Sequence, residues 1–414
     1  MTGNISDSAA LPQNSGAKTQ YGKWKAFCTC YILLVEYINY FVHTLLNLIG
    51  FKPPYVTQLV LAAGLMMLAF LFVFTKARSG GSLLFPVLVG LLYLLTYVRL
   101  SGNTHFFVSS VPEKLFLYCI PAYMAVYMLE DFDSFYEMLR KFCFFLLGVE
   151  LLTVALMTAG SSAFVQTDYQ GISYGLLIPL IFWICKEKRT KLETVGLAVA
   201  FFLMIFFGGR GPLVCVLLCV FYKMFIHAIK KPLWFVLLFA VSALLLYFYG
   251  DIIQWVISVS TRYGFSGSIV KYYQMGDIFM TGGRDLIKEY SRELISDHPI
   301  FGVGMGGTRY WLGVYGYKFG VYPHSILYEF WCDYGVILGT VLLGLLCVGI
   351  VRVFFKRKAN PKAYALFEIC VFSTGFLVLM FSSSYLFCPL FFAMLALMLR
   401  FSDKKQNSRL QSNL

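Results

Sequence analysis

Apolar runs separated by short polar breaks cover most of the chain. A helix needs about 20 mostly apolar residues to cross the hydrocarbon of a bilayer, whereas strands of a membrane barrel alternate over about 10 residues. The runs are of the first kind and predict an all-α polytopic membrane protein with about 12 transmembrane helices. The predicted spans are 27–49, 55–75, 82–99, 114–129, 141–159, 171–185, 192–208, 212–229, 232–250, 335–355, 362–380 and 385–400.

Residues 251–322 depart from this pattern, because charged, glycine and aromatic residues concentrate there. They predict one large loop between the ninth and tenth spans. A helix is expected after the glycines at 282 and 283, with Leu286, Tyr290, Leu294 and Ile295 on one apolar face, and His298 with Pro299 ends it. The predicted organisation is a flexible tail at 1–26, spans one to nine at 27–250, the loop with an interfacial helix at 251–334, spans ten to twelve at 335–400 and a tail at 401–414.

Composition excludes a soluble domain, since 59% of residues are hydrophobic, 13% are charged and the mean hydropathy is +0.72. The net charge of +13 reflects topology and does not predict a nucleic-acid partner. Breaks on the side of the termini hold 23 Lys and Arg residues, and the opposite short breaks hold four. By the positive-inside rule both tails are expected in the cytoplasm and the large loop outside.

Three residues on the expected outer face are the candidates for chemistry. Arg210 lies in GGRGP between two apolar spans, where a guanidinium is costly unless it pairs, snorkels to the surface or lines a polar cavity. Arg284 follows two glycines and opens a helix, a setting that favours an anion, although Asp285 could simply neutralise it. His324 follows Pro323 where the loop returns to the membrane, and an imidazole suits proton abstraction from a hydroxyl.

Other residues compete for these roles or add to them. His298 is a rival base, with a helix stop as its structural interpretation, and the pair Asp131 and Asp133 has the form of a metal-binding D-x-D string but fits a solvated charge run. Glu36 lies inside a predicted span, where a carboxylate is costly, and is expected to line a sugar-binding cavity or a proton path. Further predicted substrate-binding residues are Arg262 and Tyr322.

The strings GGRGP around Arg210, GGRD around Arg284, HPIFGVGMGG from His298 and HSILYEFWCDYGVILG from His324 resemble the O-antigen ligase and polymerase superfamily of polysaccharide assembly. The resemblance implies a GT-C-like membrane architecture without cofactor or metal. It also implies a glycan donor carried by undecaprenyl pyrophosphate at the outer face of the bacterial inner membrane. Arg210 and Arg284 would then bind the pyrophosphate and His324 would deprotonate the acceptor hydroxyl for an inverting transfer. Expected partners are the lipid-linked oligosaccharide, membrane lipid and a polysaccharide chain-length regulator, and no nucleic acid.

Three functions remain open at this level. A polymerase would transfer the growing glycan to a hydroxyl of the next lipid-linked repeat unit, and we expect this O-antigen, capsular or exopolysaccharide polymerase activity first. A ligase would transfer finished polymer to lipid A core or another terminal acceptor, and the same motifs serve both. A flippase for lipid-linked oligosaccharide belongs to another class, but transporters commonly have two related halves, which this chain lacks.

Overall fold

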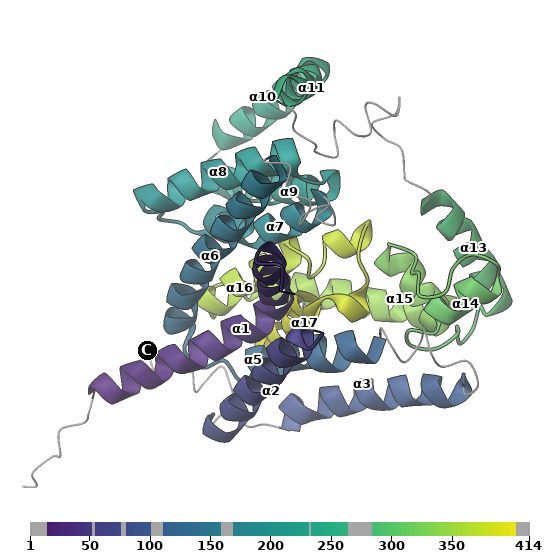
Figure 1. Cartoon of the computed structure of the whole chain (residues 1–414). Coiled ribbons are helices and arrows are strands. Elements are labelled where there is room, and N and C mark those ends of the chain that lie inside the picture. The colour runs from purple at the N-terminus through teal and green to yellow at the C-terminus, as the bar shows by residue number, and fades with distance from the viewer. Residues whose placement is uncertain are drawn as a thin grey trace, which may run out of the picture.

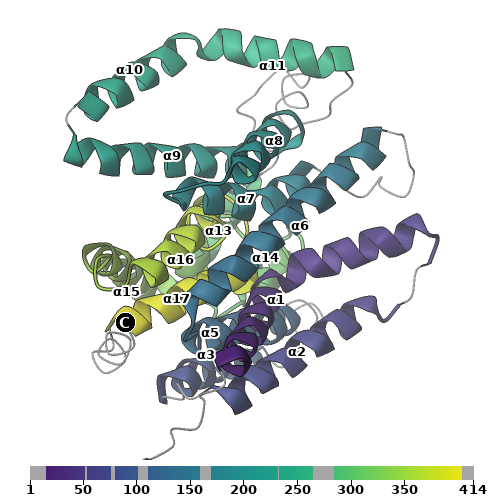
Figure 2. The same cartoon turned by 90° about the vertical axis from the view of Figure 1, so that its left-hand side faces the viewer.

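The computed structural model of the chain is a helical bundle (Figures 1 and 2). It describes residues 15–51, 54–75, 80–100, 111–158, 169–231, 233–263 and 284–402. All regular elements among these residues are helices, so the predicted all-α class is confirmed. Several of the helices are long and apolar, as in a membrane-embedded protein.

The elements follow one another in a simple order. The first part comprises α1 (Ser15–Leu48), α2 (Val56–Phe74), α3 (Gly80–Arg99), the π-helical turn η1 (Leu115–Cys119), α5 (Ile120–Tyr127), α6 (Phe132–Thr158), α7 (Tyr169–Cys185), α8 (Lys191–Phe207) and α9 (Arg210–Lys230). The second part comprises α10 (Leu233–Tyr247), α11 (Tyr249–Tyr263), α13 (Arg284–Asp297), α14 (Thr308–Val314), α15 (Ile326–Phe355), α16 (Pro361–Phe372), the 3-10 turns η3 (Val378–Met380) and η4 (Tyr385–Phe387), and α17 (Pro389–Ser402).

The core lies where α17 packs against α5, and where α1, α6 and α7 pack in succession beside them. Nearly every apolar residue of α17 is buried there, including Phe392, Met394 and Leu397. Helices at the periphery expose their apolar side chains instead, as Leu84 of α3 and Ile337 of α15 do. Such surfaces suit contact with lipid and not with water.

The expected number of 12 spans is wrong for the described residues. Four helices there are long and apolar enough to cross a membrane, Gln20–Asn47, Val56–Phe74, Arg210–Ile229 and Ile326–Phe355. A fifth span results if Phe235–Leu244 and Tyr249–Arg262, which meet at a bend of 59°, are taken together. Three other apolar runs form shorter helices, Leu83–Arg99, Gly171–Cys185 and Pro389–Phe401. The 14 residues of α17, for example, reach about 21 Å, less than the roughly 30 Å of hydrocarbon.

Several boundaries also differ from the prediction. Helix α1 begins at Ser15, so residues 15–26 are helical and not a flexible tail, and α11 continues the helical structure to Tyr263 where the loop was expected from residue 251. The loop helix is confirmed as α13, but its buried face is Ile287, Ser291 and Leu294, while Leu286 is exposed. The end residues 1–14 and 403–414 lie outside the described residues.

Helix α15 bends at Gly335, where φ is 78° and the backbone is not helical. The segment before α14 packs into this bend through backbone hydrogen bonds from Val303 N to Cys332 O at 2.8 Å and from Val336 N to Pro299 O at 2.7 Å. A Cβ at Gly335 would lie 2.3 Å from the carbonyl oxygen of Ile300, so no side chain fits. The first part of α15, from Ile326 to the bend, is helical in the region 251–334 where an interfacial helix was predicted.

We expect Gly335→Ala to lower thermal stability strongly, because the added methyl group meets backbone and φ is positive. The matched control is Gly344→Ala in the same helix, where an added Cβ has nothing within 4 Å and helix propensity favours alanine by about 0.5–1 kcal/mol. Size-exclusion chromatography of detergent-solubilised protein after heating to a series of temperatures measures the melting temperature of each variant. Equal melting temperatures for the two variants would contradict the close approach at Gly335.

Candidate functional site

The helix expected at 362–380 ends early, and an irregular segment at 373–388 connects α16 to α17. This 373–388 segment is largely buried, with Ser373, Ser384 and Leu386 fully covered. Backbone without helical hydrogen bonds is tolerated at membrane depth only where protein buries it or where it lines a polar cavity. Broken helices of this kind mark substrate sites in many membrane proteins.

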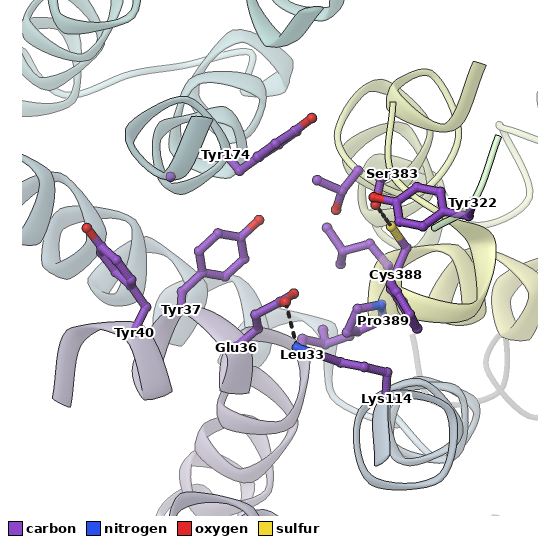
Figure 3. A pocket seen from close by; sticks show the side chains of 14 residues that line it. Leu33, Glu36, Tyr37, Tyr40, Lys114, Tyr174, Tyr322, Ser383, Cys388 and Pro389 are labelled. Atoms are coloured by element: carbon purple, nitrogen blue, oxygen red, sulfur yellow. Dashed lines mark hydrogen bonds and ion pairs between the residues drawn. The ribbon is translucent and has the colours of Figure 1, made fainter. Parts of the chain in front are cut away.

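A cavity of about 310 Å³ opens beside this segment. Its lining residues come from α1, the residue before η1, α7, the loop before α15, the 373–388 segment and the first turn of α17: Leu33, Glu36, Tyr37, Tyr40, Lys114, Gly171, Tyr174, Tyr322, Thr374, Ser383, Phe387, Cys388, Pro389 and Leu390. Glu36 and Lys114 form an ion pair of 3.1 Å at one end (Figure 3). Tyr37 and Tyr174 lie across the cavity from Ser383 and Tyr322 (Figure 3). Ring faces and hydroxyl groups therefore share one space.

His324 packs against a residue that lines this cavity. Its ring packs on that of Tyr322 with the centroids 4.3 Å apart. The backbone of His324 has φ 56°, a left-handed conformation that costs a residue with a Cβ about 1–3 kcal/mol and that clusters at functional sites. Ser383, which lines the cavity on the same side as Tyr322, has φ 58° and is the other non-glycine residue with positive φ in the described chain. Both strained residues therefore lie on the same side of the cavity, Ser383 in its lining and His324 behind Tyr322.

The imidazole of His324 is held neutral. Burial, together with the positive charges of Arg284 and Arg309, lowers its pKa from 6.5 to about 4. Its Nδ1 atom is buried and has no hydrogen-bond partner among the described residues. A neutral ring nitrogen next to a cavity can accept a proton from a hydroxyl.

The two other predicted arginines both belong to helix starts beside Phe381. Arg284, the first residue of α13, donates from Nη1 to the carbonyl oxygen of Phe381 at 2.8 Å. Arg210 is the first residue of α9, and a Cβ at the next residue, Gly211, would lie 2.8 Å from the Phe381 ring. The N–H of Gly209 donates to Ser173 of α7 and fixes this helix start. Through Phe381 the 373–388 segment therefore contacts the starts of both α9 and α13.

A residue that sequence reasoning missed is Arg309, the second residue of α14. Its side chain is 0% exposed, and Nη2 donates to Glu329 at 3.1 Å and to Ser384 at 2.5 Å. The guanidinium carbon lies 4.5 Å from the ring centre of Phe387 and 5.3 Å from that of Tyr322. Nothing in the string GGTRYW distinguishes this arginine from a solvated loop charge, so only the fold reveals its burial.

A second carboxylate, Asp333, completes a buried polar network. It accepts hydrogen bonds from the N–H of Gly306 at 3.0 Å, from the hydroxyl of Thr308 and from the hydroxyl of Tyr385 at 2.8 Å. Glu329, one helical turn earlier, accepts from Ser384 at 2.6 Å. The network fixes the glycine run and the 373–388 segment against α15.

Other predicted residues have varied positions. Glu36 and Tyr322 line the cavity as expected for substrate contact. Arg262 lies in the last turn of α11, which packs against α10 and α8, and none of these three helices lines the cavity in the described structure (Figure 1). The ring of His298 packs on Trp311 with centroids 5.1 Å apart.

The D-x-D string is structural. Asp131 accepts from the N–H of Asp133 at 3.1 Å and from that of Ser134 at 3.0 Å at the start of α6, and Asp133 pairs with Lys362 at 2.6 Å. Among the residues that the structure covers, no group of three or more His, Cys, Asp or Glu side chains could hold a metal ion.

Neither the models of known protein families nor the curated proteins contain a match to this chain.

We expect the imidazole of His324 to titrate near pH 4, and Arg284→Met to move the midpoint upward because one repelling charge is gone. NMR of protein with isotope-labelled histidine measures this, and a His324→Gln variant identifies the resonance. Since the unfolded chain binds this proton near pH 6.5, stability is complete above that pH and falls as the pH drops toward 4. A midpoint near 6.5 in the folded protein would contradict the burial of the ring.

Proposed function

We propose that this chain is a membrane glycosyltransferase that transfers a glycan from a polyprenyl pyrophosphate carrier to a hydroxyl of a lipid-linked repeat unit, as the O-antigen, capsular and exopolysaccharide polymerases do. The observation that carries the proposal is that His324 packs on Tyr322, a residue that lines the cavity beside the 373–388 segment, and that the positive charge of Arg284 acts on the same imidazole. These residues lie far apart in the sequence. Their convergence matches the division of labour that the motif resemblance implies.

The chemistry follows from the charges. The neutral ring of His324 takes the proton of the acceptor hydroxyl while the oxygen attacks the anomeric carbon of the donor sugar. The bond from that carbon to the carrier phosphate breaks from the opposite side, which inverts the configuration, and the electron pair leaves with the lipid pyrophosphate. Arg284 and Arg210 stabilise the charge that grows on this leaving group. The transfer therefore proceeds by acid–base and electrostatic catalysis from side chains.

The cavity suits the acceptor sugar. Its volume of about 310 Å³ is at the lower end of the range for small-molecule sites, about 300–1,000 Å³. The rings of Tyr37 and Tyr174 offer apolar faces to a sugar, while Glu36 and Lys114 offer a charged acceptor and donor for its hydroxyl groups. We assign the acceptor to this cavity and the diphosphate to the arginines behind it.

The direction of the helices supports an outer-face site in the bacterial inner membrane with cytoplasmic termini. In α9, Arg210 begins the helix and Lys223 lies roughly 20 Å along it at 1.5 Å per residue. Helix α7 likewise begins near the cavity, which Tyr174 lines, and ends at Cys185, directly before Lys186. Helix α17 begins at the cavity with Pro389 and carries Arg400 in its last turn. Basic residues thus gather at the helix ends remote from the cavity, and the positive-inside rule assigns those ends to the cytoplasm.

We expect His324→Ala to reduce glycan transfer by about 10²–10⁴-fold, because the general base is lost. Incubation of purified protein in nanodiscs with one lipid-linked repeat unit, followed by gel separation, measures the product. A ladder indicates polymerisation, whereas product formed only after a second, terminal acceptor is added indicates ligation. His298→Ala is the control in the same loop and is expected to retain wild-type product.

Arg284→Ala and Arg210→Ala are expected to lose about 10²–10³-fold in rate, as when one charge-stabilising donor is removed from an active site. Lys288→Ala is the matched control in α13, where its exposed ammonium lies 3.9 Å from Asp285. Wild-type product from any one of the three site variants removes that residue from the mechanism. Translocation of the lipid-linked repeat with no transfer by the wild-type protein would instead establish the flippase alternative.

The variant Glu36→Gln tests whether the cavity binds the acceptor without taking part in the reaction itself. The change keeps the size of the side chain but abolishes the charge that faces Lys114, so contacts to the acceptor weaken. We expect the KM for the acceptor to rise about tenfold while the KM for the donor stays unchanged, and steady-state kinetics at varied concentrations of each measure this. An effect on the donor alone would assign the cavity to the donor.

A further inference from the structure

The guanidinium of Arg309 has hydrogen-bond donors that meet no acceptor within the described residues. Its side chain is fully buried, and Nη2 makes both of its hydrogen bonds, to Glu329 and to Ser384. The Nε and Nη1 atoms have no acceptor within the described structure. Buried donors without acceptors cost about 1–3 kcal/mol each, and more on a charged group, so two on one guanidinium are unusual.

Two aromatic rings separate these donors from the cavity. The rings of Tyr322 and Phe387 line the cavity on one side and cover the guanidinium on the other, with ring centres 5.3 Å and 4.5 Å from its central carbon. Tyr322 belongs to the loop before α15 and is half-buried, whereas Phe387 belongs to η4. A rotation of the Tyr322 side chain would open Arg309 to the cavity.

The charges around His324 indicate the chemistry of the missing acceptor. Arg284 and Arg309 both act on the imidazole electrostatically, and Glu329 is the carboxylate paired with Arg309. Two guanidinium groups facing one neutral imidazole favour a ligand with more than one negative charge. A diphosphate has that charge and can accept hydrogen bonds on both phosphates.

We propose that Arg309 is a ligand of the substrate's diphosphate and binds it together with Arg284 once Tyr322 has moved aside. The inference rests on the proposed function and adds to it a third cationic residue that no motif identifies. In this arrangement the arginine pair closest to His324 is Arg284 with Arg309, and Arg210 acts from the far side of Phe381. The glycosidic oxygen then leaves toward buried positive charge.

The test measures binding of inorganic pyrophosphate by calorimetry, with the full-length protein in phosphatidylcholine nanodiscs. The main variant is Arg309→Met with Glu329→Gln, which removes both charges of the buried pair and keeps one carbonyl oxygen that can accept from Ser384 or from the N–H of Tyr385. Removal of both partners of a buried pair is often neutral for stability, whereas removal of one is costly. We expect the double variant to bind pyrophosphate about 10- to 150-fold more weakly than wild type, with Glu329→Gln alone near wild type.

Two controls separate ligand binding from folding. Arg309→Lys keeps the charge and loses the planar fork, so we expect intermediate affinity from a protein that melts close to wild type. Arg400→Lys changes another buried arginine, whose Nη1 donates to the carbonyl oxygens of Val126 and Leu129, and is expected to leave pyrophosphate affinity unchanged.

The outcomes are distinguishable. Wild-type affinity in the folded double variant would overturn the role of Arg309 and leave the proposed function standing. Pyrophosphate binding that depends on Arg309, without glycan transfer by the wild-type protein, would overturn the proposed function alone. Competition by phosphatidylglycerol nanodiscs as strong as that by pyrophosphate would show a general lipid-phosphate site and overturn the assignment to diphosphate.

Discussion

A polypeptide that leaves the helical conformation inside an apolar bundle must find new partners for its polar backbone groups, and here two carboxylates of one helix supply them. Glu329 and Asp333 lie one turn apart on α15 and are fully buried. One accepts from Ser384 and the backbone of Tyr385, and the other accepts from Thr308, Gly306 and the Tyr385 hydroxyl. Residues 329–333 of α15 hold both the 373–388 segment and the glycine run. The cavity is thereby defined beside the 373–388 segment.

The same arrangement explains why charge and strain gather there. Once carboxylates are buried to hold the broken helix, a cation is needed to neutralise them, and Arg309 fulfils this for Glu329. The chain must also turn sharply into α15, and His324 makes this turn in a left-handed conformation just before the N-cap Ser325. Burial, together with the positive charges of Arg284 and Arg309, lowers the pKa of that ring and keeps it neutral, so the fold produces a free base.

Much of the site was predictable from local strings, because short motifs place residues at helix starts. Arg284 and Arg210 each open a helix, as glycine-rich strings before apolar or amphipathic segments predict. The serines at 382–384 already separated two apolar runs in the sequence, yet the same composition fits a loop outside the membrane or a buried break. Arg262 was also predicted to bind substrate, but its helix α11 packs on α8 and α10.

The count of spans shows why hydropathy has limits. An apolar run of 14 or 17 residues has the same hydropathy whether it faces lipid or the interior of the bundle, and α17 and α7 belong to the interior. Helix length and packing decide between the two, and packing depends on segments remote in the chain. The prediction of 12 spans counted every apolar run as if it crossed the bilayer alone.

The sequence alone determined that this is a helical, membrane-embedded chain with one polar region, because composition and run length depend only on neighbouring residues. It also placed His324 and Arg284 among the candidates, since both stand at turns that local strings mark. Only the tertiary structure decided that Glu36 and Tyr322 share a cavity and that Arg309 is buried beside them. Their association depends on contacts between segments up to hundreds of residues apart, and no local pattern encodes which side chains those contacts enclose.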